Sequence, residues 1–259
     1  MPAVLAHCFL GNGASWAPMV GALPVPVDAL AFDMPGHGRS PMPEDPGDFH
    51  AAVTAVIGGL VTQPSLLVGH SFGGAAMLRH ALQYPSTAIG LVLIEPVLFA
   101  AARDEPEFPP YRASEQALRD AVQAGRSVDA ARRFLAMNPG SPDFDALPAS
   151  VQAVMAAQMR LLIAAEAGIF GDSGGLLTSG MMERFDVPVL LLLGGETAPI
   201  FRAVVRVLAG RLPRAEIAVI DGAGHMVPIS HPRETATVIH DWMQRSGLLA
   251  APAQTPRVG

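Results

Sequence analysis

Residues 66–78 of this chain, LLVGHSFGGAAML, begin with apolar residues, contain glycines on both sides of one serine, and end in an Ala-, Met- and Leu-rich segment. The pattern predicts a buried strand, a sharp turn at Ser71 and a helix after the turn. Gly69 and Gly73 flank the turn, where a missing Cβ relieves crowding against the neighbouring strand and helix. Because the positive end of the helix favours a developing anion, this G-x-S-x-G turn predicts a serine nucleophile. The alternative is an incidental serine in a glycine-rich connection.

Composition restricts the class of protein and of partner. The chain has 259 residues, of which 50% are hydrophobic and 15% charged, so it can bury a large core as one globular unit. No apolar run approaches the roughly 20 residues that a membrane span requires. The net charge is -6, and the 17 basic residues, all arginines, form no basic stripe. These features argue against nucleic acid or a membrane as partner and favour a small molecule, bound by a monomer or a homodimer.

Cysteine and histidine usage predicts neither a disulfide nor a metal. Cys8 is the single cysteine, and the eight histidines are scattered without the spacing of metal ligands. We therefore expect no metal and no cofactor, and we assign Cys8 to packing. The first residues, MPAVLAHCFLGNG, lack a basic region and a cleavage site, which predicts a cytoplasmic protein.

Short apolar runs alternate with helical patterns along the chain, as in a parallel α/β sheet with crossover helices. Their near-continuous Val, Ile and Leu content is typical of strands buried on both faces. Helical patterns lie at 48–62 and after Pro199 and Pro232. We expect six strands, at 2–8, 27–33, 65–70, 89–95, 187–193 and 215–220.

The region 97–185 interrupts the alternation. It contains no clear strand but has helical patterns at 114–124, 127–137 and 148–166, separated by Pro- and Gly-rich joints. We interpret it as a helical insertion that covers a cavity at the sheet. The predicted organisation is therefore a core over 1–96 and 186–247, an insertion over 97–185 and a flexible tail over 248–259.

Four motifs resemble those of the α/β-hydrolase family, in the family's order. HCFLGNG (7–13) is similar to its oxyanion loop, FDMPGHGRS (32–40) to the loop after the next strand, GHSFGG (69–74) to its nucleophile elbow, and DGAGHMVPISHP (221–232) to its histidine loop. The resemblance implies a serine hydrolase whose helical cap is the insertion. Relatives commonly begin with two further strands before the oxyanion loop, so we expect a six-stranded, all-parallel core here.

The base and the oxyanion donors follow from the nucleophile. A serine needs a base to take its proton, and His225 follows the last strand, where triads of this order place the histidine. The motif supplies one oxyanion donor, the backbone N–H of Phe72. By resemblance the second is the N–H of Phe9, although Cys8 stands where glycine is usual in the family.

The third member of the triad departs from the family. The usual acid position after the 187–193 strand is occupied by Ala198, which cannot orient a histidine. Glu95, which ends the preceding strand, lies at the edge of the sheet where α/β sites form and has the longer side chain that could reach His225. Some relatives place the acid there. Glu196, a neighbour such as Asp221, or no acid at all are the alternatives.

Taken together, the residues predict a serine hydrolase that cleaves a carboxylic ester, or a related acyl bond, of a small and mainly apolar substrate through an acyl-enzyme. The same triad serves relatives that hydrolyse carbon–carbon bonds, act as lyases, or act as cofactor-free haloperoxidases. A hydrolase fold that binds a small ligand after losing catalysis is the alternative from another class, because fold alone does not fix function.

Overall fold

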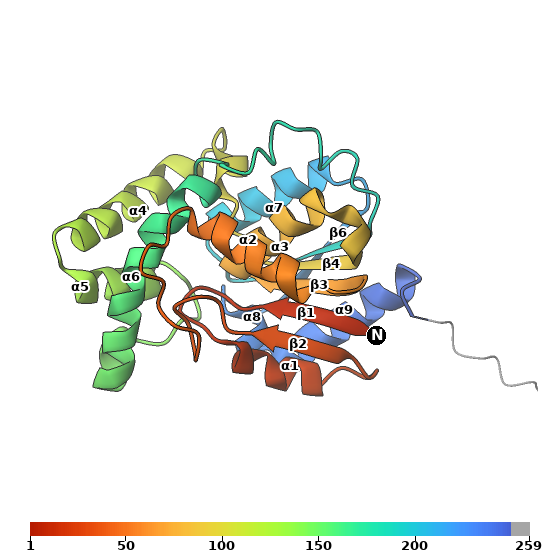
Figure 1. Ribbon diagram of the computed structural model, residues 1–259, viewed down its shortest axis with the longest axis horizontal. Coiled ribbons are helices and arrows are strands. Elements are labelled where there is room, and N and C mark those ends of the chain that lie inside the picture. Colours follow the sequence, from red (N-terminus) through yellow and green to blue (C-terminus); the bar gives the residue numbers. More distant parts are fainter. Residues whose placement is uncertain (250–259) are drawn as a thin grey trace, which may run out of the picture.

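A single six-stranded parallel sheet forms the centre of the molecule in the computed structural model, which describes residues 1–249 (Figure 1). The strand order is β2-β1-β3-β4-β5-β6. This is the predicted α/β-hydrolase architecture with six parallel strands. All but the first two residues of the predicted tail lie outside the described residues. The strands are β1 (Pro2–Ala6), β2 (Asp28–Phe32), β3 (Ser65–His70), β4 (Ala88–Ile94), β5 (Val189–Gly194) and β6 (Ala215–Ile220).

Apolar side chains alternate between the two faces of the central strands. In β4, Leu91 and Leu93 pack on one face, and Val92 and Ile94 pack on the other. Both faces are covered by helices, which explains why these strands are apolar at every position. One face carries α2 (Phe49–Leu60), α3 (Phe72–Gln83) and α7 (Pro199–Arg211), and the other carries α1 (Ala17–Gly21), α8 (Val227–Ser230) and α9 (Pro232–Arg245).

The two outer strands differ from the expectation that every strand is buried on both faces. Leu30 in β2 is 44% exposed, and Ile217 and Val219 in β6 are 49% and 45% exposed. Each of these strands pairs on one side only and lies at the rim of the helical layers. Composition alone could not separate edge strands from central ones, because both are rich in apolar residues.

The region 97–185 is helical and contains no strand, as predicted. Its helices are α4 (Phe108–Gln123), α5 (Ser127–Ala136) and α6 (Ala149–Ile169), and they lie beyond the carboxyl ends of the strands (Figure 1). Helix α4 begins six residues earlier than the pattern predicts, because the two prolines after Phe108 fit the first turn of a helix. Short 3-10 helices complete the fold, at Gly13–Trp16, Pro85–Thr87, Phe99–Ala102 and Phe144–Ala146.

Strand β1 ends at Ala6, two residues before the predicted limit, because His7 takes a role in the loop. The backbone N–H of Met34 donates to His7 Nε2 at 3.0 Å, and His7 Nδ1 donates to the carbonyl of Cys8 at 2.7 Å. Burial lowers the pKa of His7 to about 4, which keeps the ring neutral. The ring therefore ties the loop after β1 to the loop after β2.

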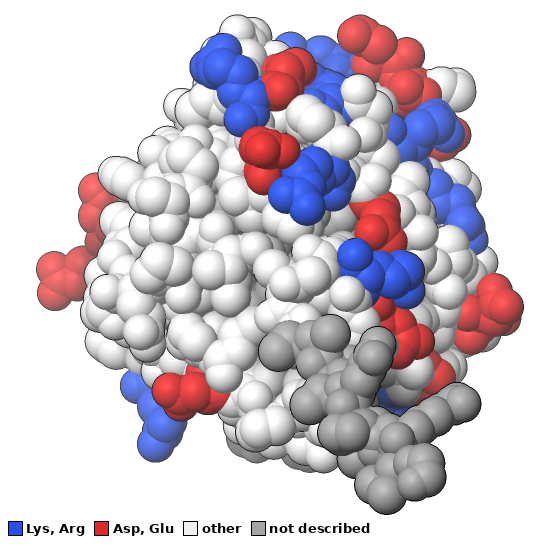
Figure 2. Space-filling view, turned by 90° about the vertical axis from the view of Figure 1, so that its right-hand side faces the viewer, with Lys and Arg blue, Asp and Glu red and all other residues white. Residues whose placement is uncertain are grey.

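The surface turned away from α4, α5 and α6 mixes charges of both signs. Figure 2 shows arginines and acidic side chains interspersed along one half of this face, while the other half is largely uncharged. In the part of the chain that the structure describes, no helix combines the length and the apolar composition needed to cross a lipid bilayer.

Candidate active site

Ser71 lies on a strained turn between β3 and α3, with φ 55° and ψ −118°. Its backbone N–H donates to the carbonyl of Ile94 at 2.8 Å, which holds the turn against the end of β4. A Cβ on Gly69 would lie 2.5 Å from the carbonyl oxygen of Gly73, and one on Gly73 would lie 2.4 Å from that of Ala6. Glycine is therefore required on both sides of the serine, for the steric reason that the sequence suggested.

Backbone strain is concentrated around this turn. Four non-glycine residues of the described chain have positive φ, and three of them, Leu10, Ser71 and Glu95, lie in the segments that follow β1, β3 and β4. Such conformations persist only where the surrounding structure enforces them, and they cluster at functional sites. The carboxyl edge of the sheet is therefore the candidate position of the active site.

His225 bridges Ser71 and Glu95. Its Nε2 lies 3.0 Å from Ser71 Oγ, and its Nδ1 lies 2.9 Å from Glu95 Oε2. All three side chains are buried. With the carboxylate on Nδ1, the ring carries its proton there and presents Nε2 as an acceptor for the serine hydroxyl proton. The structure brings together the three residues that the sequence analysis selected as nucleophile, base and acid.

Glu95 is fully buried and receives two further hydrogen bonds. The backbone N–H of Gly194 donates to Oε1 at 2.7 Å, and the hydroxyl of Thr197 donates to Oε2 at 2.5 Å. These donors offset the cost of burying a carboxylate. Thr197 was not singled out from the sequence; its only signal is a hydroxyl beside the position where relatives carry the acid.

The alternative acids lie elsewhere. The side chain of Glu196 is exposed, and among the described residues the hydrogen-bond partner of His225 Nδ1 is Glu95. Asp221 is exposed as well. Ala198 caps the start of α7 and offers no polar side chain.

Three contacts that the sequence did not predict fix the position of His225. The ring of Phe201 stacks on the imidazole at 4.3 Å between centroids and 23° between planes. The backbone N–H of His225 donates to the carbonyl of Pro139 at 2.6 Å, and its carbonyl accepts from His70 Nε2 at 2.8 Å. Pro139 follows α5, so the helical region 97–185 directly supports the histidine loop. No motif carries these contacts, because they join segments far apart in the chain.

The two residues expected to supply oxyanion donors flank Ser71. Phe72 is the first residue of α3, where a backbone N–H has no acceptor within its own helix. Within residues 1–249 the N–H of Phe9 donates to no backbone or side-chain acceptor. The two rings meet edge to face at 6.1 Å between centroids, and both line the cavity in front of Ser71.

Cys8, next to Phe9, is buried and lies in the turn of the same loop. Burial raises the pKa of its thiol to about 12, so the sulfur stays protonated and unreactive at neutral pH. Among the described residues, no group of three His, Cys, Asp or Glu side chains is arranged to hold a metal ion.

A small cavity of about 20 Å³ lies between Ser71 and the helices of the region 97–185. This volume is close to that of one water molecule. Most of its wall is apolar, and the lining residues on α6 recur at helical spacing. The apolar lining residues are Phe9, Phe72, Val97, Phe99, Phe134, Leu162, Ala165 and Ile169, and the polar ones are Ser71, Tyr111, Glu115 and Asn138.

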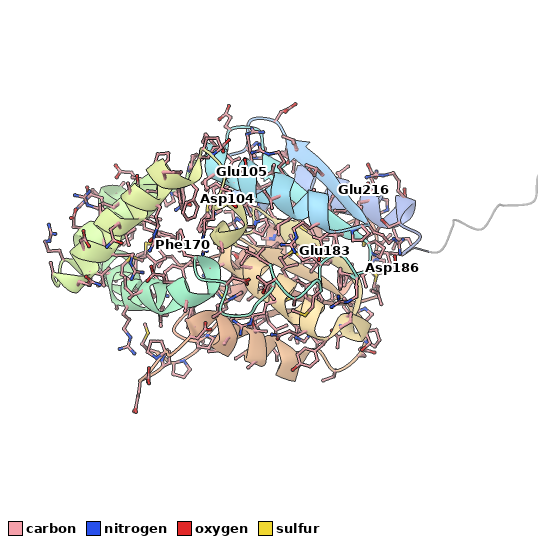
Figure 3. The ribbon with its side chains drawn as sticks, turned by 90° about the horizontal axis from the view of Figure 1, so that it is seen from above. Asp104, Glu105, Phe170, Glu183, Asp186 and Glu216 are labelled. Atoms are coloured by element: carbon pink, nitrogen blue, oxygen red, sulfur yellow. The ribbon has the colours of Figure 1, made fainter. Side chains whose placement is uncertain are left out.

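Phe170 packs against Phe99, one of the residues that line the cavity. Figure 3 shows it between α4 and the end of α6. Its ring stacks on Phe99 at 4.9 Å between centroids, and the guanidinium of Arg112 lies 4.5 Å from its centre. A surface hollow lined by Arg112 and Phe170 lies on the outer side of this layer.

Glu115 on α4 is the one buried carboxyl of the cavity wall, with 4% of its surface exposed. Burial raises its pKa to about 7, although the nearby guanidinium groups of Arg119 and Arg112 lower it. Both arginines bind Glu166 on α6 rather than Glu115. Within the described chain no donor forms a hydrogen bond with the Glu115 carboxyl, which explains why desolvation prevails over the two positive charges.

The raised pKa of Glu115 makes the stability of the protein depend on pH. The folded carboxyl binds its proton more tightly than the unfolded one, whose pKa is 4.5, so its stabilising effect is complete below about pH 4.5 and is lost as the pH rises to about 7. We expect Glu115→Gln to match the wild type in acid and to exceed its free energy of unfolding by about 3 kcal/mol above pH 7. Urea unfolding across this pH range measures the difference, and equal curves at both ends would contradict it.

Comparison with known proteins finds similar sequences and structures over most of this chain. Residues 3–238 match the model of the "Alpha/beta hydrolase family". A pimeloyl-[acyl-carrier protein] methyl ester esterase of Neisseria meningitidis is 29% identical over 255 residues, covering 96% of this chain and 78% of the relative. A 2-(acetamidomethylene)succinate hydrolase of Mesorhizobium japonicum is 26% identical, covering 92% and 86%. A thermophilic esterase structure from Thermogutta terrifontis superposes with a TM-score of 0.72 at 20% identity, covering 95% and 90%.

Proposed function

Because this chain belongs to the alpha/beta hydrolase family, we propose that it is a serine esterase that hydrolyses esters of small, mainly apolar acyl groups through an acyl-enzyme. The single observation that carries the proposal is the hydrogen-bonded series from Ser71 Oγ through His225 to Glu95, with distances of 3.0 and 2.9 Å. A buried serine bonded to an oriented histidine is the arrangement that acyl transfer needs.

In the proposed reaction, Ser71 Oγ attacks the ester carbonyl while His225 Nε2 takes the hydroxyl proton. Glu95 holds the imidazole in the required tautomer and stabilises the imidazolium that forms. The N–H groups of Phe72 and Phe9 receive the oxyanion of the tetrahedral intermediate. His225 then returns the proton to the leaving alcohol, and a water molecule, deprotonated by the same nitrogen, releases the acid from Ser71.

The apolar cavity supports a mainly apolar acyl group. At about 20 Å³ it is much smaller than an ordinary ligand pocket, so binding requires side chains of α4, α5 and α6 to move outward. We therefore propose that the region 97–185 acts as a cap, which binds the acyl chain and also positions His225 through Pro139. The proposal places the enzyme in the cytoplasm, as the sequence predicts.

Ester hydrolysis is favoured over other reactions of the same triad because esterases recur among the similar proteins. The names of several relatives specify a methyl ester, and a methanol leaving group is small enough to leave a narrow site. A carbon–carbon bond hydrolase and a bromoperoxidase are also among the similar structures, both with a TM-score of 0.68, but at 20% and 19% identity they support the fold alone.

Turnover and covalent labelling test the proposal together. We expect the protein to hydrolyse p-nitrophenyl butyrate and to take up one fluorophosphonate per chain, which mass spectrometry locates on Ser71. Prior labelling should abolish turnover, since both depend on the same hydroxyl. A protein that binds short acyl esters but shows neither turnover nor labelling would be a small-ligand-binding protein instead.

A further inference from the structure

Three polar side chains of the cap line the cavity of Ser71, and each keeps at least one polar atom that forms no hydrogen bond within residues 1–249. Tyr111 and Glu115 lie one helical turn apart on α4, and Asn138 follows α5. Asn138 Nδ2 donates to the carbonyl of Phe134 at 2.6 Å, which leaves its Oδ1 unused. Within residues 1–249 no hydrogen bond reaches the Tyr111 hydroxyl or the Glu115 carboxyl. The rest of the cavity wall, Ser71 apart, is apolar.

Unpaired polar groups in such a place are costly. Desolvation without a hydrogen-bond partner is the main cause of the raised pKa of Glu115, so an apolar residue at 115 would serve packing better. The nearest arginines do not explain Glu115, because Arg112 and Arg119 both bind Glu166. Glu115 as a residue has 4% of its surface exposed, and it lines the cavity that the reacting acyl group would enter.

We propose that Glu115, together with the Tyr111 hydroxyl and Asn138 Oδ1, binds a hydroxyl group on the acyl chain, so that hydroxyacyl esters are preferred over plain alkyl esters. This inference rests on the esterase function proposed above and specifies its substrate class. A hydroxyl suits these groups because it donates to Asn138 Oδ1 and accepts from Tyr111 or from protonated Glu115.

The charges around Glu115 indicate whether it binds a neutral or a charged group of the substrate. Arg112, Arg119 and Glu166 face it from α4 and α6, and Tyr111 precedes it on α4. Since burial keeps the carboxyl protonated up to about pH 7, it can donate a hydrogen bond to a neutral oxygen. Above that pH the ionised carboxylate would repel an acyl chain that ends in a carboxylate, and it can no longer donate to a hydroxyl.

The test compares kcat/KM for methyl esters of equal chain length by the release of methanol. The substrates are methyl hexanoate, its 3-hydroxy and 6-hydroxy derivatives, its 6-amino derivative and monomethyl adipate. At about pH 6 we expect one hydroxy ester to exceed methyl hexanoate about tenfold, the worth of one hydrogen bond. The preference should decline at about pH 8.5.

Variants at position 115 test whether this side chain causes the preference for hydroxy esters. Glu115→Gln, whose amide donates at every pH, should keep the preference and lose its pH dependence, whereas Glu115→Leu should favour methyl hexanoate. Asp120→Asn is the matched control, because it removes an exposed carboxylate from the same helix. It should change neither the preference for hydroxy esters nor its pH dependence.

Two results would overturn the inference while leaving the esterase proposal intact. One is hydrolysis of all five esters with a selectivity that Glu115→Leu does not alter. The other is a preference for the 6-amino ester at about pH 8.5, which would assign Glu115 to a cation. The absence of turnover with every ester, together with no labelling of Ser71, would instead contradict the esterase proposal itself.

Discussion

Ser71→Ala lowers kcat for p-nitrophenyl butyrate by about 10⁶, the loss expected when the nucleophile of such a triad is removed. Alanine keeps the Cβ and leaves the backbone of the turn unchanged, so only the hydroxyl and its bond to His225 Nε2 disappear. Steady-state kinetics together with fluorophosphonate labelling measure the effect. Labelling should vanish entirely, since it requires the hydroxyl of Ser71.

Folding of the Ser71→Ala protein is the control for this experiment. The hydroxyl makes one hydrogen bond, so thermal unfolding and circular dichroism should remain close to those of the wild type. A well-folded Ser71→Ala protein that retains more than about one hundredth of the activity would contradict the assigned nucleophile.

Glu95→Gln is expected to lower kcat by about 10⁴ with little change in KM. Gly194 N–H continues to require an acceptor, so the amide oxygen of the glutamine takes the place of Oε1 and its NH₂ faces His225 Nδ1. The NH₂ then donates to Nδ1, and the ring proton moves to Nε2. A protonated Nε2 cannot accept the hydroxyl proton of Ser71. The double variant with Ser71→Ala should be no slower than Ser71→Ala alone, because the residues act as a unit.

Glu196→Gln provides the matched control, since it makes the same chemical change on the adjacent, exposed candidate. The hydrogen bonds of His225 to Glu95 and Ser71 do not involve Glu196, so kcat should stay close to that of the wild type. If Glu196→Gln abolished activity and Glu95→Gln did not, the acid would be Glu196 and the geometry at Glu95 would be structural.

The fold and the main chemistry could be predicted because they depend on local patterns. The strand at 65–70, the turn at Ser71 and the following helix are encoded by apolar runs and by glycines that the turn requires sterically. The same holds for the helical region 97–185, although α4 begins earlier and the edge strands are half exposed. Whether a strand lies at the centre or at the edge of the sheet depends on its neighbouring strands, which its own residues do not specify.

The sequence by itself determined a six-stranded parallel sheet, the serine turn, the histidine loop and Glu95 as the preferred acid. Only the tertiary structure decided what holds these groups and what the substrate would meet. Thr197, Phe201 and Pro139 fix the acid and the base, and Glu115 faces the cavity of Ser71. The contact between Thr197 and Glu95 spans 102 residues. The others also join different elements of the fold, and such contacts follow from packing of the whole chain, for which no short pattern provides a signal.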